Sequence, residues 1–294
     1  HDDTVFVNSG TYSQATITIN KRLKLIGDST NKPILKNPNG NIINLTGTPF
    51  SEFTARNFRF EGNARSNDAF VGATGYYFDC EFYDFARGIL TSSGIYAYNC
   101  VFRNCTRGVQ GGSYEINQSI VDHCDIGLFG SSVNVDSSII TNNNQGVQNE
   151  TSTARYKNSI IAFNTIGINN GTSTTSVPSN NNIFWQNTTN AAGVPLADNN
   201  LYTDPMFCNL TDIGFDVRAG SPAIGASEFG TNIGKVSVAC PSIINWYVST
   251  TGSDSIGNGS SANKYASIQK AINAAGNNSD TVLVASGTYT ENIN

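Results

Sequence analysis

The sequence is poor in charged residues and has no excess of basic ones. Lys and Arg number 17 against 22 Asp and Glu, only 13% of residues are charged, and the net charge is −5. Without a basic surface the chain cannot attract a phosphate backbone, so we do not expect a nucleic-acid partner. No apolar run is long enough to cross a bilayer. No signal peptide opens the chain, which we interpret as a processed or trimmed start.

Residues for metal and nucleophilic chemistry are also scarce. Two histidines, and six cysteines without a Cys-x-x-Cys spacing, argue against a zinc site. No Gly-rich phosphate loop joins a strand to a helix, and no Ser/His/Asp set can be assigned. The single carboxylate of the Gly252–Ser255 loop, Asp254, is a weak candidate for calcium. We therefore expect no cofactor, with calcium at Asp254 as the exception to test.

Asn, Ser, Thr and Gly are abundant instead. These residues suit tight turns and a surface rich in hydroxyl and amide groups better than they suit helices. This composition favours an extracellular or cell-surface β protein.

A glycine followed by an apolar residue recurs at intervals of 20, 19, 19 and 21 residues. Such a short unit cannot close a core alone, but stacked units align equivalent positions into columns. Regular leucines for a leucine-rich repeat are absent, and a propeller blade needs about twice this period. A β-sandwich with regular strands is the alternative. The repeated pairs are Gly88-Ile89, Gly108-Val109, Gly127-Leu128, Gly146-Val147 and Gly167-Ile168.

Alternation within each unit predicts which columns face inward. The column six residues before the glycine is apolar, and the columns eight and three before it are small or amide-bearing. Asn143 and Asn164 in the last of these predict a ladder of buried amides at a turn. The column seven residues before the glycine lies between two inward columns and should form an apolar stripe on the outside. We expect the connection 172–200 or another chain to cover this stripe. Its members are Val101, Ile120, Ile139 and Ile160.

The pattern Asn/Ser-x-Ile-x-x-Asn-x-x-Gly-Ile at Ser159–Ile168 resembles the right-handed parallel β-helix repeat proteins of the pectate-lyase-like superfamily, and here the non-catalytic secreted or surface type. The resemblance implies an all-β, single-stranded parallel β-helix over residues 1–240, with a closing segment near its end. A disulfide between Cys208 and Cys240, which bracket that segment, suits an oxidising compartment. Whether the stacked pairs Cys80/Cys100 and Cys105/Cys124 are bridged stays open.

Residues 241–294 are predicted to begin a following β-helix unit. A short amphipathic helix over 267–275 precedes Asp280–Tyr289, which repeats Asp3–Tyr12 at an offset of 277 residues. In the resembled family, a helix of this kind covers the first coil. We hypothesise that this segment caps and prolongs the first coil of another copy; the alternative is a two-domain protein truncated in its second domain. The expected assembly residues are Ile268, Ala271, Ile272, Ala275, Val282 and Val284.

Catalytic residues are hard to find on this chain. Asp122 and His123 are faintly similar to a calcium-site tetrad of pectate lyases, but companion signatures are missing, and a turn position explains His123 better. Arg107 is a third weak catalytic candidate, and Arg87 with Arg107 could bind a uronate. We therefore favour a structural or adhesive module, partnered by copies of itself. The alternative is a polysaccharide-active enzyme or a carbohydrate-binding module, an analogy of fold alone.

Overall fold

The computed structural model describes residues 3–46, 53–150, 154–171, 178–193, 195–196, 199–211, 214–239, 245–275 and 280–294. The chain falls into two compact units. The first comprises residues 1–205 and 222–235, and the second comprises residues 206–221 and 236–294.

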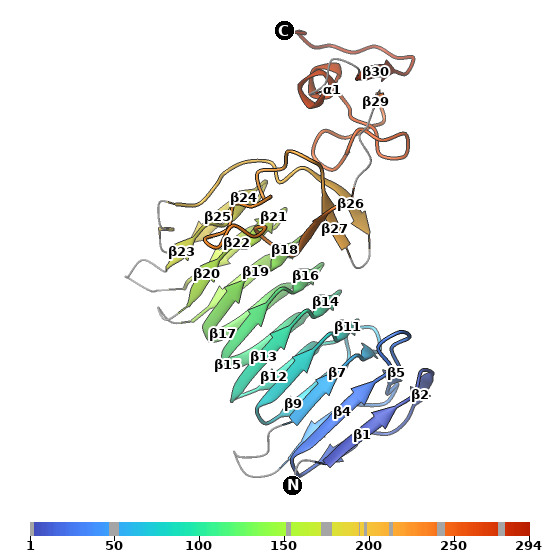
Figure 1. Cartoon of the computed structure of the whole chain (residues 1–294), viewed down its shortest axis with the longest axis vertical. Coiled ribbons are helices and arrows are strands. Elements are labelled where there is room, and N and C mark those ends of the chain that lie inside the picture. Colours follow the sequence, from blue (N-terminus) through green and yellow to red (C-terminus); the bar gives the residue numbers. More distant parts are fainter. Residues whose placement is uncertain are drawn as a thin grey trace. The chain divides into compact units, whose positions relative to one another are not determined.

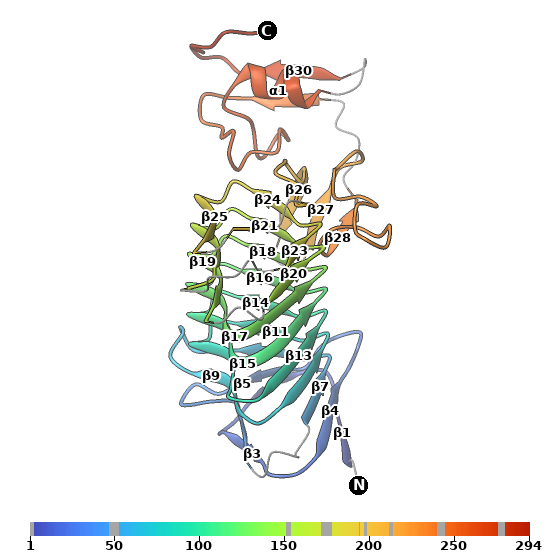
Figure 2. The same cartoon turned by 90° about the vertical axis from the view of Figure 1, so that its left-hand side faces the viewer.

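The first unit is a parallel β-solenoid, which confirms the fold predicted from the repeat (Figures 1 and 2). Each coil contributes three strands, and every described strand of the stack pairs in parallel with its equivalents in adjacent coils. The second strand of each coil belongs to a nine-stranded sheet. Its members are β2 (Thr11–Ser13), β5 (Ile34–Lys36), β8 (Arg59–Glu61), β11 (Glu81–Tyr83), β14 (Val101–Arg103), β16 (Ile120–Asp122), β18 (Ile139–Thr141), β21 (Ile160–Ala162) and β24 (Ile183–Trp185).

The first and third strands of the coils form two arms of a 16-stranded sheet, joined where β15 and β17 run continuously through both. One arm contains β1 (Asp3–Val7), β4 (Leu23–Gly27), β7 (Phe53–Arg56), β10 (Gly75–Phe78), β13 (Gly94–Tyr98), β20 (Arg155–Lys157) and β23 (Ser179–Asn180). The other contains β3 (Ile17–Ile19), β6 (Ile43–Leu45), β9 (Asp68–Gly72), β12 (Arg87–Thr91), β19 (Gln145–Asn149), β22 (Ile166–Asn169) and β25 (Thr189–Ala192). The joining strands are β15 (Arg107–Asn117) and β17 (Ile126–Asp136).

The predicted columns are in register, coil upon coil. The apolar column six residues before the glycine is fully buried, and Phe82 stacks on Phe102 with ring centroids 4.7 Å apart. Stacking of like residues packs the narrow core with aromatic and aliphatic side chains. The paired members of this column are Phe60, Phe82, Phe102, Val121, Ile140, Ile161 and Phe184.

Both turns that flank the nine-stranded sheet contain a residue with left-handed backbone, where Asn and Asp are favoured among non-glycine residues. The turns before it use Asn57, Asp79, Asn99, Gln118, Ser137, Asn158 and Asn181. The turns after it use Asp84, Asn104, His123, Asn142, Phe163 and Gln186. In both, the next residue turns inward, so the tight corner and the buried ladders arise from the same geometry.

The buried amide ladder predicted at Asn143 and Asn164 is confirmed. The backbone N–H of Asn143 donates to Asn164 Oδ1, and that of Asn164 donates to Asn187 Oδ1, each over 3.0 Å. The Nδ2 atom of Asn164 donates in turn to the carbonyl of Ile140 at 3.0 Å. These side chains satisfy backbone groups that the turn leaves unpaired inside the core.

The outward apolar stripe is covered, as expected, but at Ile139 and Ile160 the covering residue is Gly234, which lies in neither the connection 172–200 nor another chain. Ile139 and Ile160 have 0% exposed surface, although their strand faces away from the core. The chain covers them itself: a Cβ on Gly234 would lie 2.9 Å from Ile160 Cγ1 and 3.4 Å from Ile139 Cγ1. The Gly234 N–H donates to the carbonyl of Asn158 at 2.6 Å, which ties this returning segment to the sheet. The stripe is therefore an internal packing surface, since burying it here removes it from water.

The described residues of the second unit form two small sheets and one helix. Strands β26 (Phe207–Thr211), β27 (Gly214–Val217) and β28 (Val236–Val238) form the first sheet. Strand β29 (Asn245–Val248) pairs in parallel with β30 (Thr281–Val284), and helix α1 (Ile268–Ala274) packs on both. The predicted short helix near the C-terminus is thereby confirmed. Among the described residues, no helix is both long and apolar enough to span a membrane.

The amide ladder predicts a large local cost of substitution. Asn164→Ala should lower the free energy of unfolding by about 3 kcal/mol, because it leaves a buried N–H and buried carbonyls unpaired. Gln145→Ala, on the outward side of the neighbouring coil, should cost about 1 kcal/mol or less. Urea denaturation of the two variants checks this, and equal costs would contradict a stabilising role for the ladder.

Candidate functional site

Asp122 and His123 occupy the turn after β16, where the structure gives them different environments. The carboxylate of Asp122 has 1% exposed surface and lies 2.6 Å from Arg103 Nη2 and 2.7 Å from His123 Nδ1. Asn142 Nδ2 donates to its Oδ1 at 3.0 Å. Three partners from its own and adjacent coils thus surround this carboxylate. Asp122 is placed to hold the coils together, since a buried carboxylate with an Arg partner is compensated internally.

His123 is exposed and has a φ of 55°, the left-handed conformation that Asn104 and Asn142 adopt in the coils on either side. The spacing predicted that His123 is a turn residue, and its left-handed backbone conformation agrees with that prediction. The geometry places its ring beside Asp122, and its main role in the fold is to close the turn.

Arg65 also belongs to this surface, although no sequence motif marks it. Its Nη1 donates to Asp125 Oδ1 at 2.8 Å, its Nε to the carbonyl of Asn104 at 2.9 Å, and its Nη2 to the carbonyl of His123 at 3.2 Å. One guanidinium therefore links turns of two successive coils. Because Arg65 belongs to a longer loop of an earlier coil, outside the repeated positions, no periodic signal marks it.

The two arginines expected to bind a uronate lie in one column of the large sheet but have different partners. Arg87 makes a bidentate pair with Asp68 through two hydrogen bonds of 2.8 Å each. Its guanidinium is therefore already paired with a carboxylate of the chain. Asp68 raises the pKa of Arg87 through these hydrogen bonds. Arg107 instead lies 4.4 Å over the ring of Phe129 and donates to Gln110 Oε1 at 2.7 Å. Of these two arginines, Arg87 contacts a carboxylate, whereas the contacts of Arg107 are to an aromatic ring and an amide oxygen.

Beside Arg107 the outer face of the same sheet is hollowed. A groove of about 460 Å³ crosses β9, β12, β15 and β17, and combines apolar side chains with amide, hydroxyl and carboxylate groups. Gln110 and Phe129, which both contact Arg107, belong to its wall. The lining residues that define this groove are Val71, Leu90, Thr91, Gln110, Phe129 and Glu150.

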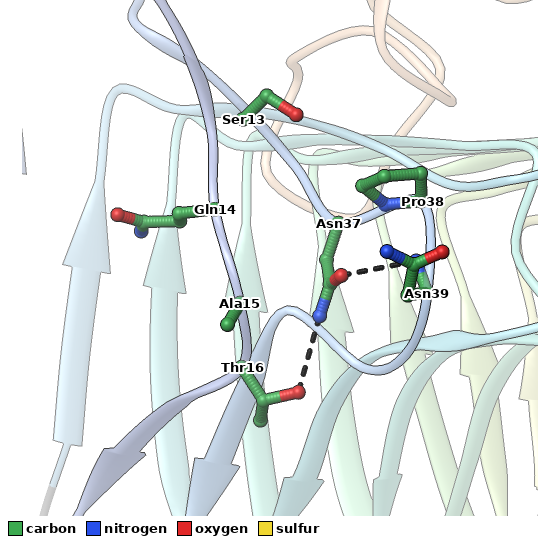
Figure 3. A pocket seen from close by; sticks show the side chains of 7 residues that line it. All are labelled: Ser13, Gln14, Ala15, Thr16, Asn37, Pro38 and Asn39. Carbon is green, nitrogen blue, oxygen red and sulfur yellow. Dashed lines mark hydrogen bonds between the residues drawn. The ribbon is translucent and has the colours of Figure 1, made fainter.

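A second hollow, of about 320 Å³, lies at the turns of the first two coils (Figure 3). Asn37 is buried at its centre, and its Nδ2 donates to Thr16 Oγ1 at 3.1 Å and to the carbonyl of Asn41 at 2.7 Å. The backbone N–H of Asn39 donates to Asn37 Oδ1 at 3.1 Å. These bonds are internal to the turns, so the hollow is a consequence of the longer loop here. Figure 3 also shows the side chain of Gln14 pointing away from Asn37.

The cysteines fall into two groups. Cys80, Cys100, Cys105 and Cys124 are free and buried, so they act as small core residues in the inward columns. Burial raises the pKa of the Cys100 thiol to about 12, which leaves it protonated and unreactive at neutral pH. Cys208 is disulfide-bonded. Its expected partner, Cys240, lies outside the described residues.

Two carboxylates meet the start of helix α1. Asp254 Oδ1 accepts the backbone N–H groups of Ala266 and Ser267, at 2.8 and 3.0 Å. Burial opposes ionisation of Asp254, but the hydrogen bonds from Ser267 and Ala266 outweigh it and set its pKa below the ordinary value. No group of three or more His, Cys, Asp or Glu side chains within the described ranges is placed to hold a metal. Calcium at Asp254 stays a prediction.

Glu291 caps the same helix from the end of the chain. Its two carboxylate oxygens accept the N–H groups of Ile268 and Gln269, each at 2.8 Å. Glu291 belongs to no motif of the sequence. The offset of 277 residues contained the signal, because it aligns Glu291 with Gln14.

The repeated segment has the same local structure in both places. Asp3–Tyr12 and Asp280–Tyr289 are identical at eight of ten positions. Each begins with a strand and continues through a glycine of positive φ, 144° at Gly10 and 159° at Gly287. In each, the tyrosine hydroxyl donates to the carbonyl four residues earlier: Tyr12 to Asn8 at 3.1 Å, and Tyr289 to Ala285 at 2.9 Å. The two segments are therefore structural as well as sequence copies.

The two copies differ in what covers them. Strand β1 ends its sheet and pairs, among the described strands, with β4 alone. Val5, whose register partner is the buried Leu25, is 44% exposed, and Phe6 is 76% exposed. In the second unit, by contrast, β29 pairs with the copied strand β30 and helix α1 contacts it. An uncovered strand with apolar side chains invites pairing with another chain.

The predicted assembly residues gather in the second unit. Ala271 is fully buried, and Ile268, Ala275 and Val282 pack against the cluster of Trp246, Val248 and Tyr265. Ile272 is half-buried, whereas Val284 remains 45% exposed. The helix face thus packs onto its own unit, and the open side of β30 retains the exposed apolar residues.

Comparison with protein-family models finds no match, and a search of curated proteins finds none either. The solenoid therefore defines the class of this protein by its fold, and its function is argued from its surfaces.

The turn geometry predicts opposite outcomes at neighbouring residues. His123→Asn should change the free energy of unfolding by no more than about 0.5 kcal/mol, because Asn adopts this φ in the adjacent coils. Asp122→Ala should cost about 3 kcal/mol, since it leaves Arg103 without its carboxylate. Thermal melts of both variants provide the measurement. A large loss of stability in His123→Asn would contradict the turn explanation.

Proposed function

We propose that this chain is a structural or adhesive β-solenoid module of an extracellular or cell-surface fibre or tandem-repeat protein, and that it assembles head to tail through residues 246–294. The observation that carries the proposal is the pair of structural copies: β1 pairs with β4 and leaves its other edge open, whereas its copy β30 pairs with β29 and contacts helix α1. The chain thus contains a strand with an open edge, β1, and also the elements that contact a copy of that strand, β29 and helix α1.

The energetics of a stack support end-to-end contact. Each inner coil is paired on both sides, whereas β1 leaves one row of backbone groups and the side chains of Val5 and Phe6 to water. Burying these two side chains is worth on the order of 3 kcal/mol, and the added strand pairing contributes further. Because the two ends of the module differ, a contact between them does not close and continues from copy to copy.

The character of the described surface also supports a structural role. The residues singled out for catalysis, Asp122 and His123, are occupied by turn and ion-pair contacts within the stack. The chain has few charged residues and many hydroxyl and amide groups, which suits a solvent-exposed extracellular module.

Association should therefore depend on the uncovered strand. Val5→Lys should weaken end-to-end association of the full chain at least about tenfold, because a charged edge residue opposes strand addition. Val238→Lys, at a valine that is 49% exposed in β28, is the matched control and should leave association unchanged. Light scattering over a concentration series measures both, and electron microscopy should show filaments that the first variant lacks. Equal association of the two variants would count against the proposal.

A second candidate function is carbohydrate binding, and the groove beside Arg107 favours it. An aromatic ring under a guanidinium, together with amide, hydroxyl and carboxylate groups, is a combination that can contact the apolar face and the polar rim of a sugar. Arg107 would meet the carboxylate of a uronate, since a guanidinium fork matches a carboxylate.

Phe129→Ala tests this candidate. It should lower affinity for a uronate oligosaccharide about tenfold by removing the ring below Arg107. Arg87→Lys, at the arginine paired with Asp68, should have little effect on binding. Titration calorimetry with a uronate and a neutral oligosaccharide compares them, and an absence of binding by the unaltered chain would rule the candidate out.

A further inference from the structure

We infer that two copies join by strand exchange, in which residues 3–14 of one copy, a segment that begins with β1, replace residues 280–294 in the second unit of another. The inference rests on the proposed head-to-tail assembly and specifies its contact. The partner is a second copy of this chain, and β29 receives β1 in the register that it uses for β30.

The residues that hold the displaced segment are repeated in the incoming one. Within the second unit, Asp280 Oδ2 accepts the indole N–H of Trp246 at 3.2 Å, and Val282 packs on the apolar cluster. Tyr289 packs on that cluster too, and Glu291 accepts two N–H groups of helix α1. At the offset of 277 the incoming segment supplies Asp3, Val5, Tyr12 and Gln14. Three are identical, and the fourth retains an amide oxygen as acceptor.

These incoming groups are accessible in the first unit. Val5 is 44% and Tyr12 38% exposed, and the side chain of Asp3 is 59% exposed. Asp3 pairs with Lys21 at 2.9 Å, a surface contact that exchanges at little cost. Gln14 is exposed, and its side chain points away from Asn37 in Figure 3. The incoming segment is therefore already ordered and presents its contact groups to water.

The displaced segment is held more weakly than the incoming one. β1 pairs with β4 over five residues and is followed by β2, which pairs with β5. Among the described strands, β30 pairs with β29 alone, over four residues. Replacing a loosely held segment by a preordered strand loses little conformational entropy in the incoming chain and gains burial at its open end.

The register follows from the pairing inside the second unit. There Tyr247 pairs with Leu283, and Val248 pairs with Val284. Subtracting 277 places Tyr247 opposite Phe6 and Val248 opposite Val7 of the second copy. Each copy has one donor strand and one acceptor unit, so exchange propagates as a filament.

A cysteine trap distinguishes this pairing from others. Parallel partners lie about 4.8 Å apart, within the range that a disulfide bridges. The chain with Phe6→Cys and Tyr247→Cys should form covalent multimers under mild oxidation, resolved as a ladder on a non-reducing gel. The matched control, Tyr247→Cys with Leu283→Cys, locks the segment in its own unit and should remain monomeric. A register control, Thr4→Cys with Tyr247→Cys, should not crosslink, because its partners lie about 8 Å apart.

Light scattering on the same samples separates the two hypotheses. A ladder with the first pair and a monomer with the lock support strand exchange. If the unaltered chain assembles but the first pair gives no intermolecular bond, or the locked chain still assembles, strand exchange is overturned while head-to-tail assembly stands. If the disulfide of the first pair forms within a single chain, the partner of β29 is not a second copy, and the inference is overturned. If the unaltered chain does not assemble at any concentration, both hypotheses are overturned.

Discussion

The structure depends on in-register parallel stacking, which places the same position of every coil directly above itself. Once the strands pair this way, each backbone group in a turn must be satisfied by its own coil or the next one. Asn143 and Asn164 meet this requirement with their side-chain amides, and Ser119, Ser138 and Ser159 do so with hydroxyls. The narrow core, the left-handed turn residues and the preference for Asn and Ser follow from that single constraint.

Stacking also creates the problem of the ends. An inner coil finds a partner above and below, but the first coil of this chain leaves Val5 and Phe6 uncovered. The second unit contains a copy of that strand together with a partner strand, a helix and a carboxylate cap. Stability in a solenoid comes from neighbours, so the pairing inside the second unit is a template for the pairing that an open end lacks. The proposed head-to-tail assembly would use these two ends of the module.

Between the ends, the polar groups that attract a catalytic interpretation are engaged in coil-to-coil contacts. Asp122 is buried against Arg103, and Arg87 is paired with Asp68. A column of stacked side chains brings charges within contact distance whether or not a ligand is present, so opposite charges along a column neutralise one another. The groove near Phe129 is the place where Arg107 rests on an aromatic ring instead.

The solenoid, its inward columns, the amide ladder, the short helix and the repeated strand could all be predicted from the amino-acid sequence. These features are periodic or local, and periodicity alone decides which side chains meet in a stack. Three contacts could be found only in the folded chain: Gly234 returns to cover Ile139 and Ile160, Arg65 bridges two later turns, and Glu291 caps helix α1. Each of these contacts joins residues from loops or tails outside the repeat. Their positions depend on how irregular segments fold back, and no period in the sequence encodes that path.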